Sequence, residues 1–416
     1  MNNSINTKAS DKHTETSAGS AEVLYFHQVD DPYSHLAVQC LAPLAAAYQV
    51  KVIPHLVPPP DDTAAPERAR LKAYALRDAA RLARRYCLSY PDAAREPDAA
   101  SIQLATVRLA KAIETGAFSE NAPAISGDLW FGRSSNAGGV DWPVTKRMLV
   151  EGEALRRALG HYLGAMFYFD NEWYWGVDRL HHLETRLRSE RLVRDPSQPP
   201  IAPLQTTVLD GPRAAKPPLI EFWFSFRSPY VYIATPRLHR LAEHYGAEMR
   251  WRFIIPMIMR GLPVSPDKTR YIMLDSRREG KLYNMDFGTV VDPVGAGSDR
   301  ITAVLHRAIA VGKGAAFTEL ALRAVFHDGL DLATDDGLLK LARSAGLTEA
   351  DVSEALADES WRVVAEENRR ALLDAGLWGA PTYRVNGGPA HWGQDRLWAL
   401  EEDLKAAIAS QSPPMR

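Results

Sequence analysis

Apolar positions in the second half of the chain first form a short run and then recur at helical spacing. Residues 219–226 are mainly apolar and aromatic, which is typical of a buried strand. Ser228 and Pro229 follow, and this pair is a helix-start signal, because the serine hydroxyl accepts a free backbone N–H and proline has none to leave unpaired. We therefore expect a strand and then a helix that runs to about Tyr245 and ends at Gly246.

The pattern continues as an α/β arrangement with an insertion. Residues 250–255 predict a second strand, so the first three elements form a β-α-β unit with a right-handed crossover. From about 268 to 375 the periodicity is helical, which predicts an all-helical insert. Residues 381–385 and 390–392 predict two short strands around a turn, and an amphipathic helix follows from 394. The fold class is therefore α/β.

The same pattern occurs twice in the chain. Residues 25–37 align without gaps with residues 222–234. The same register places Tyr74, Asp78, Tyr86 and Tyr90 of the first copy on Tyr271, Asp275, Tyr283 and Phe287 of the second. Near the end, residues 175–180 (WGVDRL) pair with 392–397 (WGQDRL). The repeat predicts two copies of one fold.

The repeat also sets the expected domain boundaries. The first domain spans 22–189 and the second spans 218–410. Residues 190–217 are marked by Pro and Gly and lack periodicity, so they are expected to be a linker. The polar segment 1–21 is expected to be a disordered tail, and 411–416 a second tail.

Composition and charge narrow the classes of function. Hydrophobic residues make up 46% of the chain and charged residues 24%, as in an ordinary globular protein. The net charge of −2, with basic residues spread throughout, predicts neither a nucleic-acid nor a membrane partner, and no segment has the length of a transmembrane span. The two cysteines, Cys40 and Cys87, form no CxxC pair, and both are expected to be buried and inert. We expect a cytoplasmic protein.

Three motifs in order relate the second domain to a known family. They are the Ser-Pro helix start, Gly379-Ala380-Pro381 before a strand, and a Trp-Gly-Gln-Asp-Arg segment after it, with Tyr271-x-x-x-Asp275 in the insert. Residues 218–410 resemble the 2-hydroxychromene-2-carboxylate isomerases and the kappa-class glutathione transferases, which are thioredoxin-fold relatives of DsbA. The resemblance implies two thioredoxin-like domains, each with a helical insertion of the DsbA/kappa type, because the first domain looks like a diverged copy.

Ser228 is the candidate catalytic residue, as the resemblance implies, and glutathione is the implied cofactor. A glutathione thiol is mostly protonated at neutral pH, so a catalyst must stabilise its thiolate. A hydroxyl at a helix N-terminus does so with a hydrogen bond and with the positive end of the helix dipole. The alternative is that Ser228 is only an N-cap.

The implied glutathione site surrounds Pro381, which is cis in the family. A cis proline turns the backbone of Ala380 outward, where its N–H and C=O can pair with an extended peptide, whereas a trans proline would simply begin an edge strand. Gln394 and Asp395 start the last helix, whose N-terminus favours an anion. Asp395 is expected to accept from the γ-glutamyl ammonium, and plain N-capping is the alternative.

Arg260 and Trp378 complete the predicted glutathione site. Arg260 stands where the kappa class has a lysine, although residues 262–266 (LPVSP) replace the Asn and paired prolines of the family. Trp378 could equally pack. Four aromatic residues are expected to wall a pocket for a planar substrate, although aromatic residues at such spacing usually belong to the core. They are Phe226, Tyr230, Tyr232 and Tyr283.

The first domain lacks the parts that this chemistry needs. Asp31 stands at the serine position, and a carboxylate would repel a thiolate; Met166 stands at the cis-proline position. His27 and His35 flank this region, but no further ligands lie nearby in sequence, so no metal is expected. We interpret the first domain as a degenerate copy that stabilises the second, in an intramolecular pseudo-dimer or a homo-oligomer.

The predicted function is a glutathione-dependent cis–trans isomerisation in the second domain. The substrate would be an unsaturated, aromatic-derived keto acid or a similar small electrophile, to which the thiolate adds before rotation and elimination. A kappa-like glutathione transferase that releases the adduct is the close alternative, and a non-catalytic thioredoxin-fold scaffold is another. A thiol-disulfide oxidoreductase is disfavoured because the second domain has no cysteine.

Overall fold

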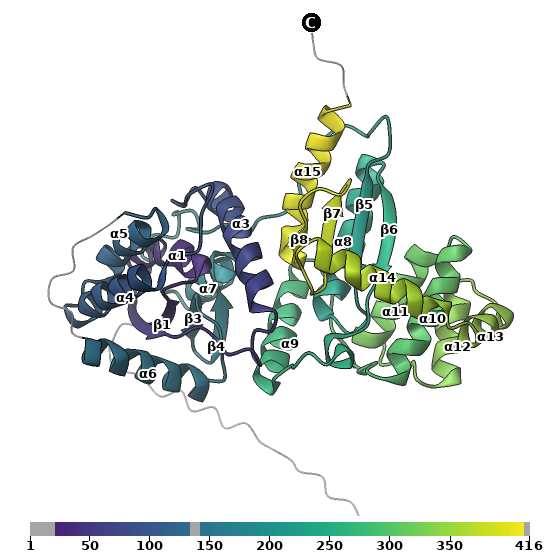
Figure 1. Cartoon of the computed structure of the whole chain (residues 1–416), viewed down its shortest axis with the longest axis horizontal. Coiled ribbons are helices and arrows are strands. Elements are labelled where there is room, and N and C mark those ends of the chain that lie inside the picture. The colour runs from purple at the N-terminus through teal and green to yellow at the C-terminus, as the bar shows by residue number, and fades with distance from the viewer. Residues whose placement is uncertain (1–20, 134–141, 412–416) are drawn as a thin grey trace, which may run out of the picture.

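Two four-stranded sheets organise the chain, one in each half (Figure 1). The computed structural model describes residues 21–133 and 142–411, so most of each predicted tail lies outside the described residues. The strand orders are β2-β1-β3-β4 and β6-β5-β7-β8. In each sheet the first two strands are parallel and the remaining pairs are antiparallel. The predicted fold class, two thioredoxin-like α/β domains with helical insertions, is confirmed.

The N-terminal domain is built from the elements β1 to α7. Its first β-α-β unit consists of β1 (Ala21–Gln28), α1 (Pro32–Val38), α2 (Leu41–Ala47) and β2 (Val50–Val57). The insert consists of α3 (Arg68–Tyr86), α4 (Ala99–Glu114), α5 (Phe118–Trp130) and α6 (Trp142–Ala158). The domain closes with β3 (Met166–Phe169), β4 (Glu172–Trp175), a 3-10 turn (Val177–Arg179) and α7 (Leu180–Ser189).

The C-terminal domain repeats this order from β5 to α15. It opens with β5 (Leu219–Phe224), α8 (Pro229–Tyr245), β6 (Glu248–Phe253) and a 3-10 turn (Met257–Arg260). The insert consists of α9 (Pro266–Lys281), α10 (Ala296–Ala310), α11 (Gly314–Phe326), α12 (Asp335–Ser344), α13 (Glu349–Ala357) and α14 (Ser360–Asp374). The domain ends with β7 (Thr382–Val385), β8 (His391–Trp392), a 3-10 turn (Gln394–Arg396) and α15 (Leu397–Ala409).

Strand β5 is apolar except for the buried Glu221, because both of its faces are covered. Phe222 and Phe224 point into the main core, where Phe222 stacks on Tyr383 of β7 with ring centroids 5.5 Å apart. Trp223 points to the other face, and its indole N–H donates to the backbone carbonyl of Asn368 on α14 at 2.9 Å. The predicted strand was therefore correct, except that it ends at Phe224.

The following helix has the predicted bounds. Ser228 is the N-cap of α8, Pro229 is its first residue, and Gly246 ends it with a φ of 66°. A backbone in this left-handed region suits glycine, which has no Cβ to clash. The helix start that the site depends on is thus encoded locally.

The segment 190–217, which joins the two domains, forms hydrogen bonds with both of them. The Glu184 carboxylate of α7 accepts from the backbone amides of 201–202, and the Glu401 carboxylate of α15 accepts from those of 208–209. The two glutamates stand at equivalent positions of the repeat. The predicted linker, 190–217, is therefore docked through matching backbone contacts.

The two domains meet through reciprocal buried ion pairs. Arg179 of the N-terminal domain contacts Asp275 at 3.0 Å and Asp395 at 2.7 Å. Arg396 of the C-terminal domain contacts Asp78 at 2.9 Å. Arg179 and Arg396 are equivalent in the repeat, as are Asp78 and Asp275, so the contacts are related as in an isologous dimer interface. The motifs shared by the two copies therefore form the domain junction.

The two cysteines differ in their surroundings. Cys40 is buried, and burial raises the pKa of its thiol to about 12. Cys87 is exposed, so the prediction that it is buried was wrong. It follows the last residue of α3 with a φ of 55°, where the helix has already ended.

None of the helices in the described part of the chain is both long and apolar enough to cross a membrane.

Candidate active site

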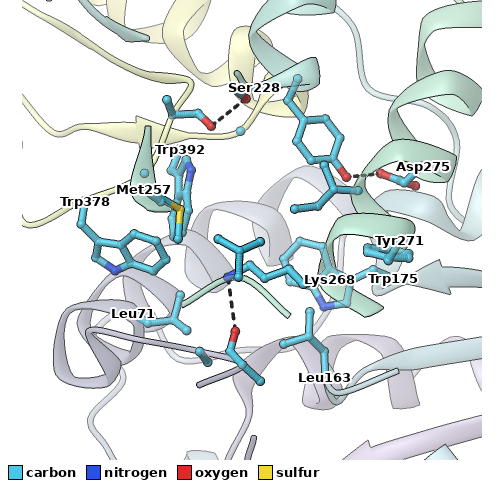
Figure 2. A pocket seen from close by; sticks show the side chains of 18 of the residues that line it. Leu71, Leu163, Trp175, Ser228, Met257, Lys268, Tyr271, Asp275, Trp378 and Trp392 are labelled. Carbon is cyan, nitrogen blue, oxygen red and sulfur yellow. Dashed lines mark hydrogen bonds between the residues drawn. The ribbon is translucent and has the colours of Figure 1, made fainter. Parts of the chain in front are cut away.

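Ser228 lies at a cavity that both domains line, which we call the interdomain cavity. Its volume is about 580 Å³, within the usual range of small-molecule sites. Figure 2 shows Ser228 at one edge, with Trp378 and Trp392 on one side and Tyr271 and Trp175 on the other. The start of α8, the turn before β7 and helix α9 thus face residues of the N-terminal domain.

The Ser228 hydroxyl makes two long hydrogen bonds. It accepts from the backbone N–H of Val231 at 3.4 Å and donates to the backbone carbonyl of Ala380 at 3.3 Å. Both distances exceed the usual range for such bonds. The hydroxyl is therefore held only weakly, at the positive end of α8.

The turn that faces Ser228 carries the cis proline that the resemblance implies. The Ala380–Pro381 peptide bond is cis. A Cβ on Gly379 would lie 2.3 Å from the indole of Trp392, so only glycine lets this ring pack against the turn. Trp378 meets Trp392 edge-on, with ring centroids 4.9 Å apart. Two indoles therefore flank the backbone beside the serine.

Seven basic and seven acidic residues line the cavity, and two of the basic residues, Arg260 and Lys268, have lowered pKa values. Arg260 donates to the backbone carbonyl of Trp378 at 3.1 Å, and burial together with the nearby Arg369 lowers its pKa to about 10. Lys268 donates to the backbone carbonyl of Ala64 at 3.2 Å, and burial lowers its pKa to about 8. Within the described ranges neither of these two forms a salt bridge, whereas the other five basic residues of the cavity wall do.

Lys268 was missed by the sequence analysis. It follows the N-cap Ser265 by three residues in α9, where a lysine ordinarily projects into water. Its side chain is half-buried, and it reaches the N-terminal domain at the carbonyl of Ala64. No local signal distinguishes it from a surface lysine.

Gln394 and Asp395 are occupied by protein contacts. The Gln394 amide accepts from Arg237 at 2.6 Å and donates to Glu279 at 2.5 Å, so its side chain has turned into the core. The predicted side-chain role of Gln394 in ligand binding is not favoured. The Asp395 carboxylate pairs with Arg179, yet its side chain remains 18% exposed and lines the cavity.

Of the four aromatic residues predicted to wall a substrate pocket, the structure places Tyr230 on the interdomain cavity. Tyr230 lines the cavity, whereas Tyr232 follows it by two residues and lies on the opposite face of the helix, against other aromatic rings. Phe226 is buried in the core, and Tyr283 stacks on Arg237 with 3.6 Å between guanidinium and ring centroid. The structure therefore places these three side chains away from the interdomain cavity, because sequence spacing does not reveal which face meets it.

Apolar residues of both domains form much of the rest of the cavity wall. Those labelled in Figure 2 are Leu71, Leu163, Trp175, Met257, Trp378 and Trp392. Residues Leu71, Leu163 and Trp175 belong to the N-terminal domain, so the site needs both halves of the chain for its shape.

Asp31 is the residue of the N-terminal domain that is equivalent to Ser228, and it also lines the interdomain cavity. Asp31 caps α1 and accepts from the backbone N–H of Ser34 at 2.9 Å, and burial raises its pKa to about 6. Among the described peptide bonds, the one before Met166 is not cis. An acceptor therefore occupies the position where Ser228 offers a donor.

These features define the class of the C-terminal domain. It has a thioredoxin-like sheet, a serine at the first helix N-terminus and a cis proline facing it. The family described as DSBA-like thioredoxin domain matches residues 219–405, so this half of the chain is a DsbA-like thioredoxin domain.

Its relatives are isomerases by name. The 2-hydroxychromene-2-carboxylate isomerases of Pseudomonas sp. (strain C18) and Pseudomonas putida are each 28% identical over 201 residues. The matches cover 45% of this chain and 91% and 94% of those proteins. A solved structure of 2-hydroxychromene-2-carboxylate isomerase is 24% identical with a TM-score of 0.41, over 47% of this chain and 100% of that one.

Proposed function

We propose that the protein is a glutathione-dependent cis–trans isomerase with its chemistry at Ser228. The observation that carries this proposal is the position of the Ser228 hydroxyl, at the N-terminus of α8 and 3.3 Å from the carbonyl of Ala380, on the wall of the interdomain cavity. The similarity to isomerases supports the reaction type. The proposed substrate is a small, unsaturated, aromatic-derived keto acid.

The cavity fits an anionic peptide such as glutathione. The Nε of Arg260 and the indole N–H of Trp378 are buried and find no hydrogen-bond partner among the described residues. Such unpaired donors cost about 1–3 kcal/mol each, which carboxylates of a ligand would recover. Asp395 would accept from an ammonium group while keeping its arginine contact, because a carboxylate has about four acceptor sites.

The residues around Ser228 would each have a separate role in the proposed reaction. Bound glutathione supplies a thiolate that adds to the electron-poor double bond and leaves after rotation about the resulting single bond. Ser228 would donate to the sulfur in place of the Ala380 carbonyl, and the N-terminus of α8 favours the negative charge. Lys268 would bind the substrate carboxylate, and the surrounding indoles exclude water.

We further propose that the N-terminal domain is the partner half of an intramolecular pseudo-dimer. The reciprocal Arg179 and Arg396 contacts support this arrangement, as do the cavity residues that the N-terminal domain supplies. Asp31 of the N-terminal domain would then contribute to the shape of the cavity and would take no part in thiolate chemistry.

Glutathione dependence is the first expected result. The full chain, incubated with 2-hydroxychromene-2-carboxylate, is expected to isomerise it only when glutathione is present, and to leave the glutathione concentration unchanged. Absorbance spectra follow the substrate, and a thiol assay follows glutathione. Stoichiometric loss of glutathione would assign a transferase instead. The absence of both turnover and calorimetrically detected glutathione binding would contradict the proposal.

Lys268 is expected to make substrate binding depend on pH. Its ammonium is present below its pKa of about 8 and is lost above it, so KM for an anionic substrate should rise as the pH passes through about 8. Lys268→Met is expected to raise KM about 10–100-fold at pH 7, the effect of a charged hydrogen bond, and to remove that rise. Steady-state kinetics from pH 6.5 to about 9 measure both effects.

Lys281→Met is the matched control. Lys281 is an exposed lysine in the last turn of the same helix, α9. It should keep the wild-type KM profile. A pH profile of Lys268→Met identical to that of the wild type would remove Lys268 from substrate binding.

A further inference from the structure

A second polar cluster joins the two domains outside the interdomain cavity. His181 and His182 come from α7 of the N-terminal domain, and Glu279 comes from α9 of the C-terminal domain. One potential ligand atom of each lies within 4.8 Å of the other two. The Glu279 Oε1 is 2.6 Å from His182 Nε2 and 4.0 Å from His181 Nε2.

His181 has no bonding partner that would explain its position. Its side chain is 9% exposed, and neither ring nitrogen has a hydrogen-bond partner in the part of the chain that the structure describes. A neutral imidazole carries a lone pair on one of its ring nitrogens. A buried polar ring of this kind needs a partner, and a metal ion is one that it can bind.

The surroundings of Glu279 orient its carboxylate. The oxygen that faces away from the histidines accepts from the Gln394 amide at 2.5 Å, as outer-shell partners do for metal-binding carboxylates. Arg179 lies 3.3 Å from the other oxygen. Arg179 also pairs with Asp275 and Asp395, which are shared with Arg278 and Arg396.

The repeat shows that docking itself does not require this cluster. The positions equivalent to Glu279, His181 and His182 in the other half of the junction are Leu82, Trp398 and Ala399. All three are buried and belong to one apolar cluster across the junction. An apolar contact therefore closes one side of the junction, whereas the other side carries three metal-binding side chains.

We propose that His181, His182 and Glu279 bind one Zn²⁺ ion that links the two domains. Two imidazoles and a carboxylate form a donor set that zinc uses, with a fourth position for water. Because the ligands come from both domains, metal binding stabilises the docked arrangement over any separated one. The site is independent of Ser228 and of glutathione.

Zinc titration of the full chain tests the site. After removal of metal with a chelator, the wild type is expected to bind one Zn²⁺ per chain by calorimetry, to take up Co²⁺ with a visible tetrahedral spectrum, and to melt at a higher temperature with Zn²⁺. Glu279→Gln and His181→Leu are expected to weaken binding by more than about 100-fold, beyond the range for outer-shell changes. Both should lose the visible cobalt band.

Two comparisons separate lost binding from lost folding. Glu279→Gln keeps the shape of the side chain, and the shift in melting temperature on adding Zn²⁺ is measured for each variant against its own metal-free form. His327→Gln, which alters a histidine of the C-terminal insert beside Asp328, should bind Zn²⁺ as the wild type does. The absence of binding to the wild type at micromolar Zn²⁺, or unchanged affinity in both cluster variants, would overturn the site.

Discussion

Ser228→Ala is expected to lower kcat/KM by about 10²–10³-fold, the usual effect of removing one hydrogen-bond donor from a developing anion. Glutathione affinity should change little, because Arg260, Trp378 and the turn at Ala380 remain. The absorbance of the bound thiolate should fall at neutral pH, since its pKa is no longer lowered by the hydroxyl. Steady-state kinetics, calorimetry and ultraviolet difference spectra measure the three effects.

Ser265→Ala is the matched control for this substitution. Ser265 precedes Pro266 and caps α9 through the backbone N–H of Lys268, so both variants lose a serine N-cap before a proline. Each should lose about 0.5–2 kcal/mol of stability for that reason. Ser265 does not line the interdomain cavity. An equal loss of activity in the two variants would assign Ser228 a capping role alone.

Arg396→Met is expected to lower the free energy of unfolding of the full chain by about 3–5 kcal/mol. The guanidinium is 2% exposed and contacts Asp78 at 2.9 Å and Asp178 at 2.8 Å. Its removal leaves both carboxylates buried without their cation, and the cost is a large part of the ordinary stability of a domain. Urea unfolding followed by tryptophan fluorescence measures the change.

Arg186→Met is the control for Arg396→Met, because it removes exposed ion pairs in place of buried ones. Arg186 contacts Asp170, Glu172 and Glu190, but these groups are well exposed to solvent. Exposed ion pairs contribute about 0–1 kcal/mol, so this variant should unfold almost as the wild type does. Equal destabilisation of the two variants would show that the junction does not depend on its buried ion pairs.

Much of the fold was accessible from local patterns. The apolar run of β5, the N-cap at Ser228 and the stop at Gly246 each depend on neighbouring residues, and the structure has each of them. The match between residues 25–37 and 222–234 predicted one fold used twice, and both sheets have the same strand order.

Only part of the candidate site could be predicted from the sequence. The motif residues Ser228, Ala380 and Pro381 do meet on the cavity wall, together with Arg260 and Trp378. Three of the four predicted aromatic residues do not line this cavity; Tyr232, for example, lies on the face of α8 that packs inside its own domain.

The sequence by itself determined the repeat, the order of the elements and the place of Ser228 at a helix start. These follow from interactions within a few residues: strand composition, capping and the backbone limits of proline and glycine. The tertiary structure alone decided that Lys268 is half-buried against the N-terminal domain, that Asp395 pairs with Arg179 and that Leu71 and Trp175 wall the cavity. Each of these depends on contact between residues far apart in the chain, and the docking of one domain on the other sets that contact.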